Sequence, residues 1–146
     1  MELGLKNKSA LVLASSSGLG KAIAMELARE GARVMLCGRS EEQLKRARQD
    51  ILNATGNEPE YLAGSITDPR YIQELVQTTV EKCGPIFALV NNSGGPKPGP
   101  FDSFDDQAWQ DAYELCLLSY IRTIRAVLPY MRANGGGRIL CSTSSS

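Results

Sequence analysis

The sequence predicts an α/β protein, a doubly wound parallel sheet with helices on both of its faces. Apolar runs of strand length alternate with amphipathic runs of helix length along the chain. The first strand segment, residues 9–14 (SALVLA), is almost continuously apolar, as expected for a strand that helices cover on both sides. A repeated strand–helix order places the strands parallel and joins them by right-handed crossovers.

The elements follow one another without an internal repeat or linker, so residues 1–146 are predicted to form one domain. The predicted strands are residues 9–14, 32–37, 60–63, 86–90 and 138–141. The predicted helices are residues 18–30, a helix that begins after Ser40, a helix that begins after Asp68, and residues 105–133. The proline- and glycine-rich residues 92–100 are predicted to be a loop.

Local side chains predict where these helices begin and how the last one behaves. Ser40-Glu41-Glu42-Gln43 has the form of a capping box, and Asp68 followed by Pro69 is an N-cap with proline at the first helical position. Residues 105–133 are apolar on more than one face, which predicts contact with the sheet and with a second subunit of a homo-oligomer. Pro129 within this helix predicts a kink or an early end.

Composition excludes several classes of protein. The 16 acidic residues balance the 16 basic residues, so no nucleic-acid or membrane-surface partner is expected. No apolar run approaches membrane-spanning length and the N-terminus lacks a signal-peptide core, which predicts a soluble, cytoplasmic protein.

The cysteines and the absence of histidine narrow the chemistry. Cys37, Cys83 and Cys141 fall in apolar segments and are expected to be buried, and no metal site is predicted because no ligand cluster surrounds any cysteine. The chain has no histidine, which excludes a Ser-His-Asp triad and most zinc sites.

The turn after the first strand has the composition of a site for a dinucleotide pyrophosphate. It consists of Ala14, Ser15, Ser16, Ser17, Gly18, Leu19 and Gly20. Glycines let the backbone approach phosphates closely, serine hydroxyls can donate to them, and the following helix offers free N–H groups. The alternative is an ordinary strand–helix turn with capping serines. The position of the turn after the first strand favours a Rossmann-type nucleotide site.

The end of the second strand distinguishes the two nicotinamide cofactors. An acidic residue there would bind the ribose 2′-hydroxyl of NAD, but the sequence has Cys37-Gly38-Arg39-Ser40 instead. Arg39 can form charge-assisted hydrogen bonds with a 2′-phosphate, and Ser40 can donate to the same group. NADP is therefore expected rather than NAD. The alternative is a solvated arginine that precedes a helix.

Three motifs together resemble the short-chain dehydrogenase/reductase family. The first turn is similar to its TGxxxGxG pattern, with Leu13 and Ala14 in place of Thr and Gly. Asn91, Asn92, Ser93 and Gly94 are similar to its NNAG motif beside the adenosine. Residues 137–144 (GRILCSTS) are similar to the strand that carries its active-site serine, at Ser144. The resemblance covers essentially the whole chain and is closest to reductases of the 3-oxoacyl-(acyl carrier protein) type.

The resemblance implies hydride transfer between nicotinamide and a carbonyl or alcohol carbon of a small molecule. In the family a tyrosine transfers the proton, a lysine lowers the pKa of that tyrosine, and a serine, here Ser144, holds the reacting oxygen. The tyrosine and lysine belong to a YxxxK motif on the next helix. The chain ends at Ser146 without them. It is therefore interpreted as a Rossmann domain that lacks its C-terminal strands and has little activity alone.

Departures from the family pattern leave two other hypotheses open. Cys116 stands where the family has an asparagine of the proton relay, Ser65 where an aspartate binds the adenine amino group, and Phe87 where a strand aspartate is usual. A nucleotide-binding or assembly module without catalysis is the first alternative. A flavodoxin-like FMN-binding or receiver fold is the second, and Arg39 and the Asn91-Asn92 pair disfavour it.

Overall fold

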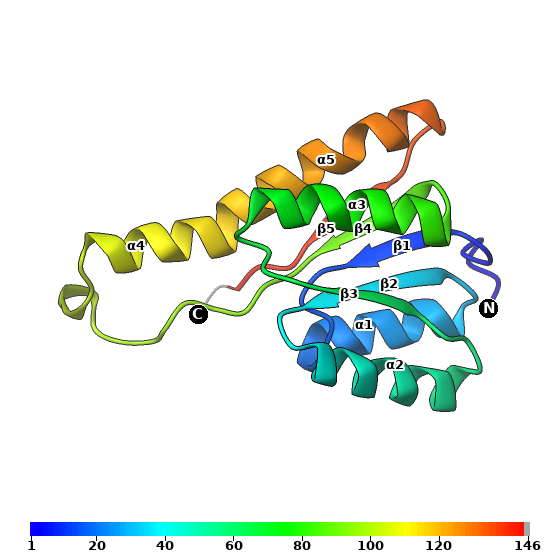
Figure 1. The fold of residues 1–146 in the computed structure, drawn as a ribbon, viewed down its shortest axis with the longest axis horizontal. Helices are drawn as coiled ribbons and strands as arrows, with labels where there is room; N and C mark the ends of the chain where they lie inside the picture. Colours follow the sequence, from blue (N-terminus) through cyan, green and yellow to red (C-terminus); the bar gives the residue numbers. More distant parts are fainter. Residues whose placement is uncertain (145–146) are drawn as a thin grey trace.

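The computed structural model describes residues 1–144, which contain a parallel five-stranded sheet of order β3-β2-β1-β4-β5 (Figure 1). The strands are β1 (Ser9–Val12), β2 (Arg33–Gly38), β3 (Glu60–Ala63), β4 (Ile86–Asn91) and β5 (Arg138–Cys141). The α-helices are α1 (Gly18–Arg29), α2 (Glu41–Thr55), α3 (Pro69–Cys83), α4 (Asp106–Tyr113) and α5 (Ser119–Ala133). A 3₁₀ turn, η1, spans Phe101–Ser103, and a π-helical turn, η2, spans Glu114–Leu118. The doubly wound architecture expected from the sequence is confirmed.

Helices cover the two faces of the sheet because alternate residues of the central strand point to opposite sides. Ala10 and Val12 of β1 belong to one buried cluster with residues of α1 and α2. Leu11 and the following Leu13 belong to the other cluster, with residues of α3 and α5. Figure 1 shows α1 and α2 on one side of the sheet and α3 and α5 on the other. The apolar run of residues 9–14 thus has the double burial that its composition predicts.

The order of the strands fixes where a ligand can bind. From β1 the chain proceeds to β2 and β3 on one side of the sheet, and β4 and β5 are added on the other side. The connections leave the carboxyl ends of β1 and β4 in opposite directions. A crevice forms at such a switch point, and ligands of open parallel sheets bind there.

The C-terminal helical run differs from the expectation at Pro129. The helix continues past this residue to Ala133, so the expected early end is wrong. The run is interrupted fifteen residues before the proline instead, where Glu114–Leu118 form the π-turn. Such a turn inserts one extra residue into the helix and rotates the flanking faces relative to each other.

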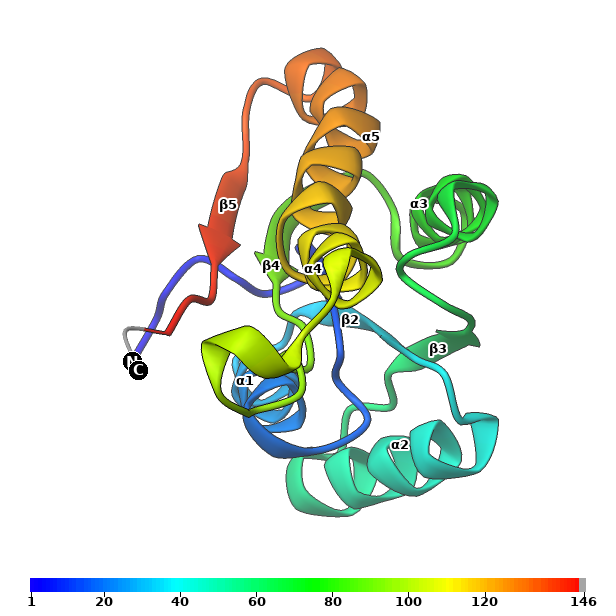
Figure 2. The same cartoon turned by 90° about the vertical axis from the view of Figure 1, so that its left-hand side faces the viewer.

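Strand β5 lies at the edge of the sheet, where it pairs with β4 alone (Figure 2). All four of its residues are exposed, including Leu140 at 55%. Cys141 is therefore exposed, and the expectation that its apolar segment would bury it is wrong. Cys37 and Cys83 are buried as expected. Within residues 1–144, the helices are all too short or too polar to cross a bilayer.

Candidate functional site

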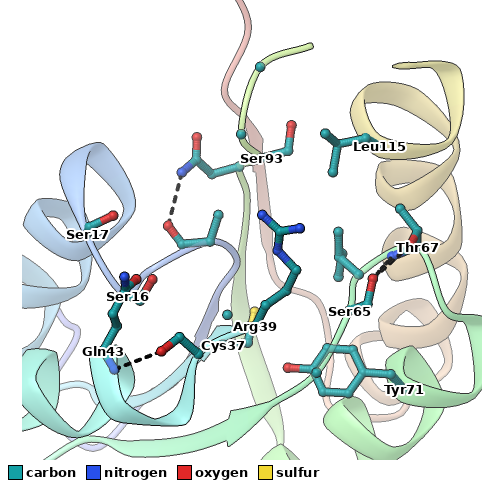
Figure 3. Close-up of a pocket in the computed structure, with 18 of the residues that line it drawn as sticks. Ser16, Ser17, Cys37, Arg39, Gln43, Ser65, Thr67, Tyr71, Ser93 and Leu115 are labelled. Carbon is teal, nitrogen blue, oxygen red and sulfur yellow. Dashed lines mark hydrogen bonds between the residues drawn. The ribbon is translucent and has the colours of Figure 1, made fainter. Parts of the chain in front are cut away.

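A cleft of about 1140 Å³ opens at the carboxyl ends of the central strands (Figure 3). Four parts of the chain build it: the β1–α1 turn, the β2–α2 turn, the segment after β3 with the start of α3, and the β4–α4 loop together with the end of α4 and the start of η2. Its lining includes Ala14, Ser16, Ser17, Leu19, Cys37, Gly38, Arg39, Ser40, Ser65, Thr67, Tyr71, Asn92, Ser93, Gly94, Gly95, Asp111, Glu114 and Leu115. Ten of the residues predicted to bind a cofactor therefore line one cavity.

The β1–α1 turn is so tight that Gly20 admits no side chain. A Cβ atom on Gly20 would lie 2.1 Å from the carbonyl oxygen of Ala14. Gly18 has φ +56°, a conformation that glycine adopts without strain. Ala14 also has a left-handed backbone, at φ +48°, which costs a residue with a Cβ roughly 1–2 kcal/mol. The geometry explains why the family pattern has glycine at this position.

The N-terminus of α1 differs from those of α2, α3 and α4. The side chain of Ser17, its N-cap residue, makes no capping hydrogen bond, and its first turn carries no acidic residue. The other three helices are capped by Ser40, Asp68 and Asp105. The first N–H groups of α1 and the positive end of its dipole thus remain available at the wall of the cleft.

Two of the predicted cofactor-binding residues are structural instead. Ser15 is fully buried: its hydroxyl donates to the Val12 carbonyl at 2.7 Å and accepts from the Cys37 amide at 3.0 Å. Its expected role as a phosphate donor is wrong, because both of these bonds tie β1 to β2. Asn91 is also fully buried, and its Oδ1 accepts from Thr123 Oγ1 at 2.6 Å. This side chain fixes β4 to α5 and does not reach the cleft.

Arg39 extends into the middle of the cleft (Figure 3). In the described part of the chain no carboxylate lies within 4.0 Å of its guanidinium, so its donors are not consumed by an ion pair. The neighbouring Ser40 caps α2 by accepting from the Gln43 amide at 3.2 Å, which leaves its hydroxyl hydrogen free to donate. A guanidinium with open donors in a cleft is suited to a bound anion.

Ser65 and Tyr71 form the wall opposite the first turn (Figure 3). The Ser65 and Thr67 hydroxyls lie 2.8 Å apart. A Cβ on Gly64 would lie 2.1 Å from the Tyr71 ring, so the glycine makes room for the aromatic wall. The Tyr71 hydroxyl donates to the Leu62 carbonyl at 2.6 Å, and burial raises the pKa of this phenol.

Tyr71 and Cys37 were not expected in the site. Burial raises the pKa of the Cys37 thiol to about 11 and also raises that of Tyr71, so at neutral pH both side chains are uncharged and neither is a nucleophile. In the sequence, the feature that could have indicated the position of Tyr71 is Gly64. A glycine between a strand and a helix that begins five residues later indicates a close approach by another group.

The far end of the cleft is formed by the β4–α4 loop and the π-turn. Side-chain positions at Gly94 and Gly95 would meet nothing within 4 Å, so these glycines leave open space. Asn92 donates weakly to the Ala14 carbonyl at 3.5 Å, which connects this loop to the first turn. The Cys116 thiol in the π-turn points to the Gly94 carbonyl at 3.9 Å.

Ser144 lies beyond the end of β5, is exposed, and does not line the cleft. The chain that leads to it is held at Ser142, whose amide donates to the Asn91 carbonyl at 2.8 Å. The Tyr120 hydroxyl donates to the Ser142 carbonyl at 3.0 Å, and burial raises the pKa of this tyrosine. The direction of the chain at Ser144 is thus set by β4 and α5.

The chain is similar to oxidoreductases along almost its whole length. A Streptomyces coelicolor protein that carries the name ketoacyl reductase is 36% identical over 133 residues, which are 90% of this chain and 51% of that protein. L-sorbose reductase from Gluconobacter frateurii, solved with NADPH and L-sorbose, is 32% identical with a TM-score of 0.93 over 99% of this chain and 55% of its own. A 7α-hydroxysteroid dehydrogenase solved with NADH is 32% identical with a TM-score of 0.90, over 96% of this chain and 54% of its own.

The chain thus spans about half the length of the relatives it matches. The family model for short chain dehydrogenases matches residues 8–146, which include the first turn, Arg39, the asparagine pair and the last strand. With this match and the shared architecture, the chain belongs to the short-chain dehydrogenase family.

Proposed function

We propose that residues 1–146 are one NADP-binding domain of an oxidoreductase that transfers hydride between nicotinamide and a carbonyl or alcohol carbon. The observation that carries the proposal is Arg39, an unpaired guanidinium in a cleft whose other wall is the open N-terminus of α1. Family membership supports the redox chemistry, and the volume of the cleft, about 1140 Å³, is slightly above the usual range for small-molecule sites.

The residues of the cleft fit a dinucleotide. The backbone at Gly18, Leu19 and Gly20 would hold the pyrophosphate, because no side chain caps the first N–H groups of α1. Ser16 and Ser17 line the same wall and would donate their hydroxyls. Space beside Asn92, Ser93 and Gly94, which line the cleft, would accommodate the rest of the dinucleotide.

The choice of NADP rests on the end of β2. Arg39 and Ser40 would bind the 2′-phosphate, and no acidic residue of this segment is placed to hold the 2′-hydroxyl of NAD. One similar structure contains NADPH and another contains NADH, so relatives alone do not decide between the cofactors. On the opposite wall, the Ser65 hydroxyl would bind the adenine amino group and Tyr71 would form an apolar surface beside the base.

When bound, the nicotinamide gives or accepts the hydride. Ser144 would hold the oxygen of a small carbonyl or alcohol substrate, at a position directed by the Tyr120 and Asn91 contacts to Ser142. Proton transfer in the family needs a tyrosine with lysine four residues later, and residues 1–146 contain no such spacing. We therefore expect the chain alone to show little turnover.

A nucleotide-binding module without catalysis is the second candidate. The observation that favours it is Cys116, whose thiol stands in the π-turn and contacts the Gly94 carbonyl. A thiol is a poorer hydrogen-bond partner than the amide that the family has there. Cys116→Asn separates the two candidates in a chain extended to include the tyrosine and lysine. Hydride transfer by the Cys116→Asn variant alone supports a nucleotide-binding module without catalysis. Hydride transfer by both the Cys116 and the Asn forms supports an enzyme.

An exposed apolar face supports self-association through the long helical run. Trp109, Tyr113, Leu117 and Ile121 follow one another at four-residue intervals and are 38% to 52% exposed. Such a stripe favours a second subunit over water. Sedimentation of wild-type protein and of Leu117→Glu tests this proposal, which predicts that the charged variant is monomeric.

Affinity for NADPH and NADH tests the main proposal. Arg39→Ala removes charge-assisted hydrogen bonds of about 1.5–3 kcal/mol, which corresponds to about a 10- to 100-fold loss of NADPH affinity. Binding of NADH should change little. Arg132→Ala is the matched control, because Arg132 is exposed in the last turn of α5, away from the cleft. Equal loss for both cofactors, or none for NADPH, would contradict the role of Arg39.

A further inference from the structure

A second, mostly apolar cavity of about 530 Å³ lies next to the cleft, between the β4–α4 loop and α4. Its apolar walls include Phe104, Trp109, Ala112 and Leu115. Gly95, Asp111 and Leu115 line both this cavity and the cleft, so the two spaces adjoin. A volume of this size is typical of sites for small molecules with an apolar body.

The walls of this cavity are fixed without a ligand. Pro96, Pro98 and Pro100 restrict the backbone of the loop. A Cβ on Gly99 would lie 2.9 Å from the Phe104 ring, so the loop is in close contact with this ring. The Trp109 ring is 5.3 Å from the Phe101 ring at an interplanar angle of 58°, yet Trp109 remains 52% exposed. Because the cavity is preformed and the edge of the Trp109 ring is exposed, burial of an apolar ligand surface there is favourable.

Two residues of opposite charge make the electrostatic potential differ between the two ends of the cavity. Lys97 lines this cavity and not the cleft, and it makes no hydrogen bond or ion pair with the residues that the structure describes. Asp111 lies at the junction with the cleft, where its Oδ1 accepts from Gln107 Nε2 at 2.8 Å. An anionic group is thus attracted to Lys97 and repelled from the junction.

We propose that this cavity binds a small organic carboxylate, with its carboxylate at Lys97 and its apolar body against Phe104 and Trp109. The opposite end of such a ligand lies at the junction with the cleft, beside Asp111. This inference deepens the proposed function and rests on it in one respect: the ligand is the substrate only if the cleft binds the nicotinamide. Asp111 can then accept a hydrogen bond from a hydroxyl at that end.

Trp109 is the only tryptophan of the chain and lines this cavity, so its fluorescence reports on ligands there when the protein concentration, and with it self-association through the same residue, is held constant. Titration with octanoate should give a saturable change in emission. Hexanoate should bind roughly tenfold more weakly, because each buried methylene contributes about 0.8 kcal/mol. 1-Octanol, which has the same chain without the charge, should bind about two- to fivefold more weakly than octanoate.

Variants assign the effect to the two parts of the site. Lys97→Gln should bind octanoate and 1-octanol with equal affinity. Lys45→Gln, an exposed change on α2, is the control and should still bind octanoate more tightly than 1-octanol. Ala112→Leu should fill the cavity and abolish both responses, with folding checked by circular dichroism. The proposal is wrong if octanol binds wild-type protein as tightly as octanoate, if Lys97→Gln keeps the preference, or if neither compound changes the emission.

Cofactor titration keeps this outcome separate from the proposed function. Arg39→Ala should bind octanoate like the wild type, because Arg39 does not line the second cavity. Octanoate binding without any NADPH binding would support the cavity and contradict the proposed function. NADPH binding with no response to octanoate would support the proposed function and contradict the carboxylate site in the second cavity.

Discussion

The β1–α1 and β2–α2 turns connect a strand to a helix at the same edge of the sheet, but their helix ends differ. In the β2–α2 turn the Ser40 hydroxyl accepts from the Gln43 amide, and Glu41 and Glu42 complement the helix dipole. In the β1–α1 turn, Ser17 caps nothing and no acidic residue is present in the first turn. Ala14 there also has a strained left-handed backbone.

The difference shows that the same strand–helix unit can have a helix N-terminus that a side chain caps or one that no side chain caps. α2 satisfies its own N-terminus and presents Arg39 to the cleft just before its cap. α1 leaves its first N–H groups without a side-chain cap, and its turn is tight with a left-handed backbone at Ala14. Changes in the two turns should therefore affect stability and cofactor affinity to different extents, and seven substitutions, some of them controls, measure this.

Gly20→Ala should be the most damaging change in the β1–α1 turn. Its Cβ would lie 2.1 Å from the Ala14 carbonyl oxygen, so the turn must open. We expect a loss of about 3 kcal/mol in the free energy of unfolding, measured with urea, and loss of NADPH binding. Gly56→Ala is the control: its φ is +75° but its Cβ position is open, so it should cost about 1 kcal/mol and spare binding.

Ser15→Ala tests the structural role of this buried hydroxyl. It removes two hydrogen bonds and leaves the Cys37 amide without its side-chain partner, which should lower the free energy of unfolding by about 2 kcal/mol. Ser16→Ala, in the cleft wall, should leave stability unchanged and weaken NADPH binding. Equal stability of the two variants in urea would show that Ser15 does not connect the strands.

Ser40→Ala and Ser17→Ala compare the two N-caps directly. Loss of the Ser40 cap should cost about 1 kcal/mol of stability, whereas Ser17→Ala should cost almost nothing because its hydroxyl caps no amide. Thermal unfolding by circular dichroism measures both. A large destabilisation by Ser17→Ala would mean that the α1 terminus is satisfied by its own residues and is not reserved for a ligand.

Ala14→Gly should give a small change, and it should be stabilising. Relief of the left-handed strain gains roughly 1–2 kcal/mol, and the greater freedom of glycine in the unfolded chain costs about 0.4–1 kcal/mol. A net gain of about 0.5 kcal/mol in urea is expected. A loss of stability would contradict the strain at this residue.

Much of this fold follows from local patterns. The alternation of strands and helices, the caps at Ser40 and Asp68, and the tight turn with Gly18 and Gly20 are all visible as periodicity or as residue types at fixed spacing. These features depend on residues a few positions apart, so they can be predicted from the sequence. The cofactor-binding role of Arg39 and the catalytic role of Ser144 remain predictions.

Other features depend on contacts between distant segments. Ser15 and Asn91 resemble cleft residues in the sequence, but Cys37 and Thr123, from other elements, engage them in the interior. Tyr71 becomes a cleft wall only because Gly64 leaves room for it.

The amino-acid order therefore determined which elements form and where the chain turns tightly, because backbone preferences and side-chain periodicity act over a few residues. Only the folded molecule decided which polar side chains face the cleft, that β5 and Cys141 lie exposed at an edge, and that the long helix is interrupted at the π-turn rather than at Pro129. The physical reason is that burial and hydrogen-bond partners are properties of neighbours in space, and these neighbours come from parts of the chain 20 to 50 residues apart.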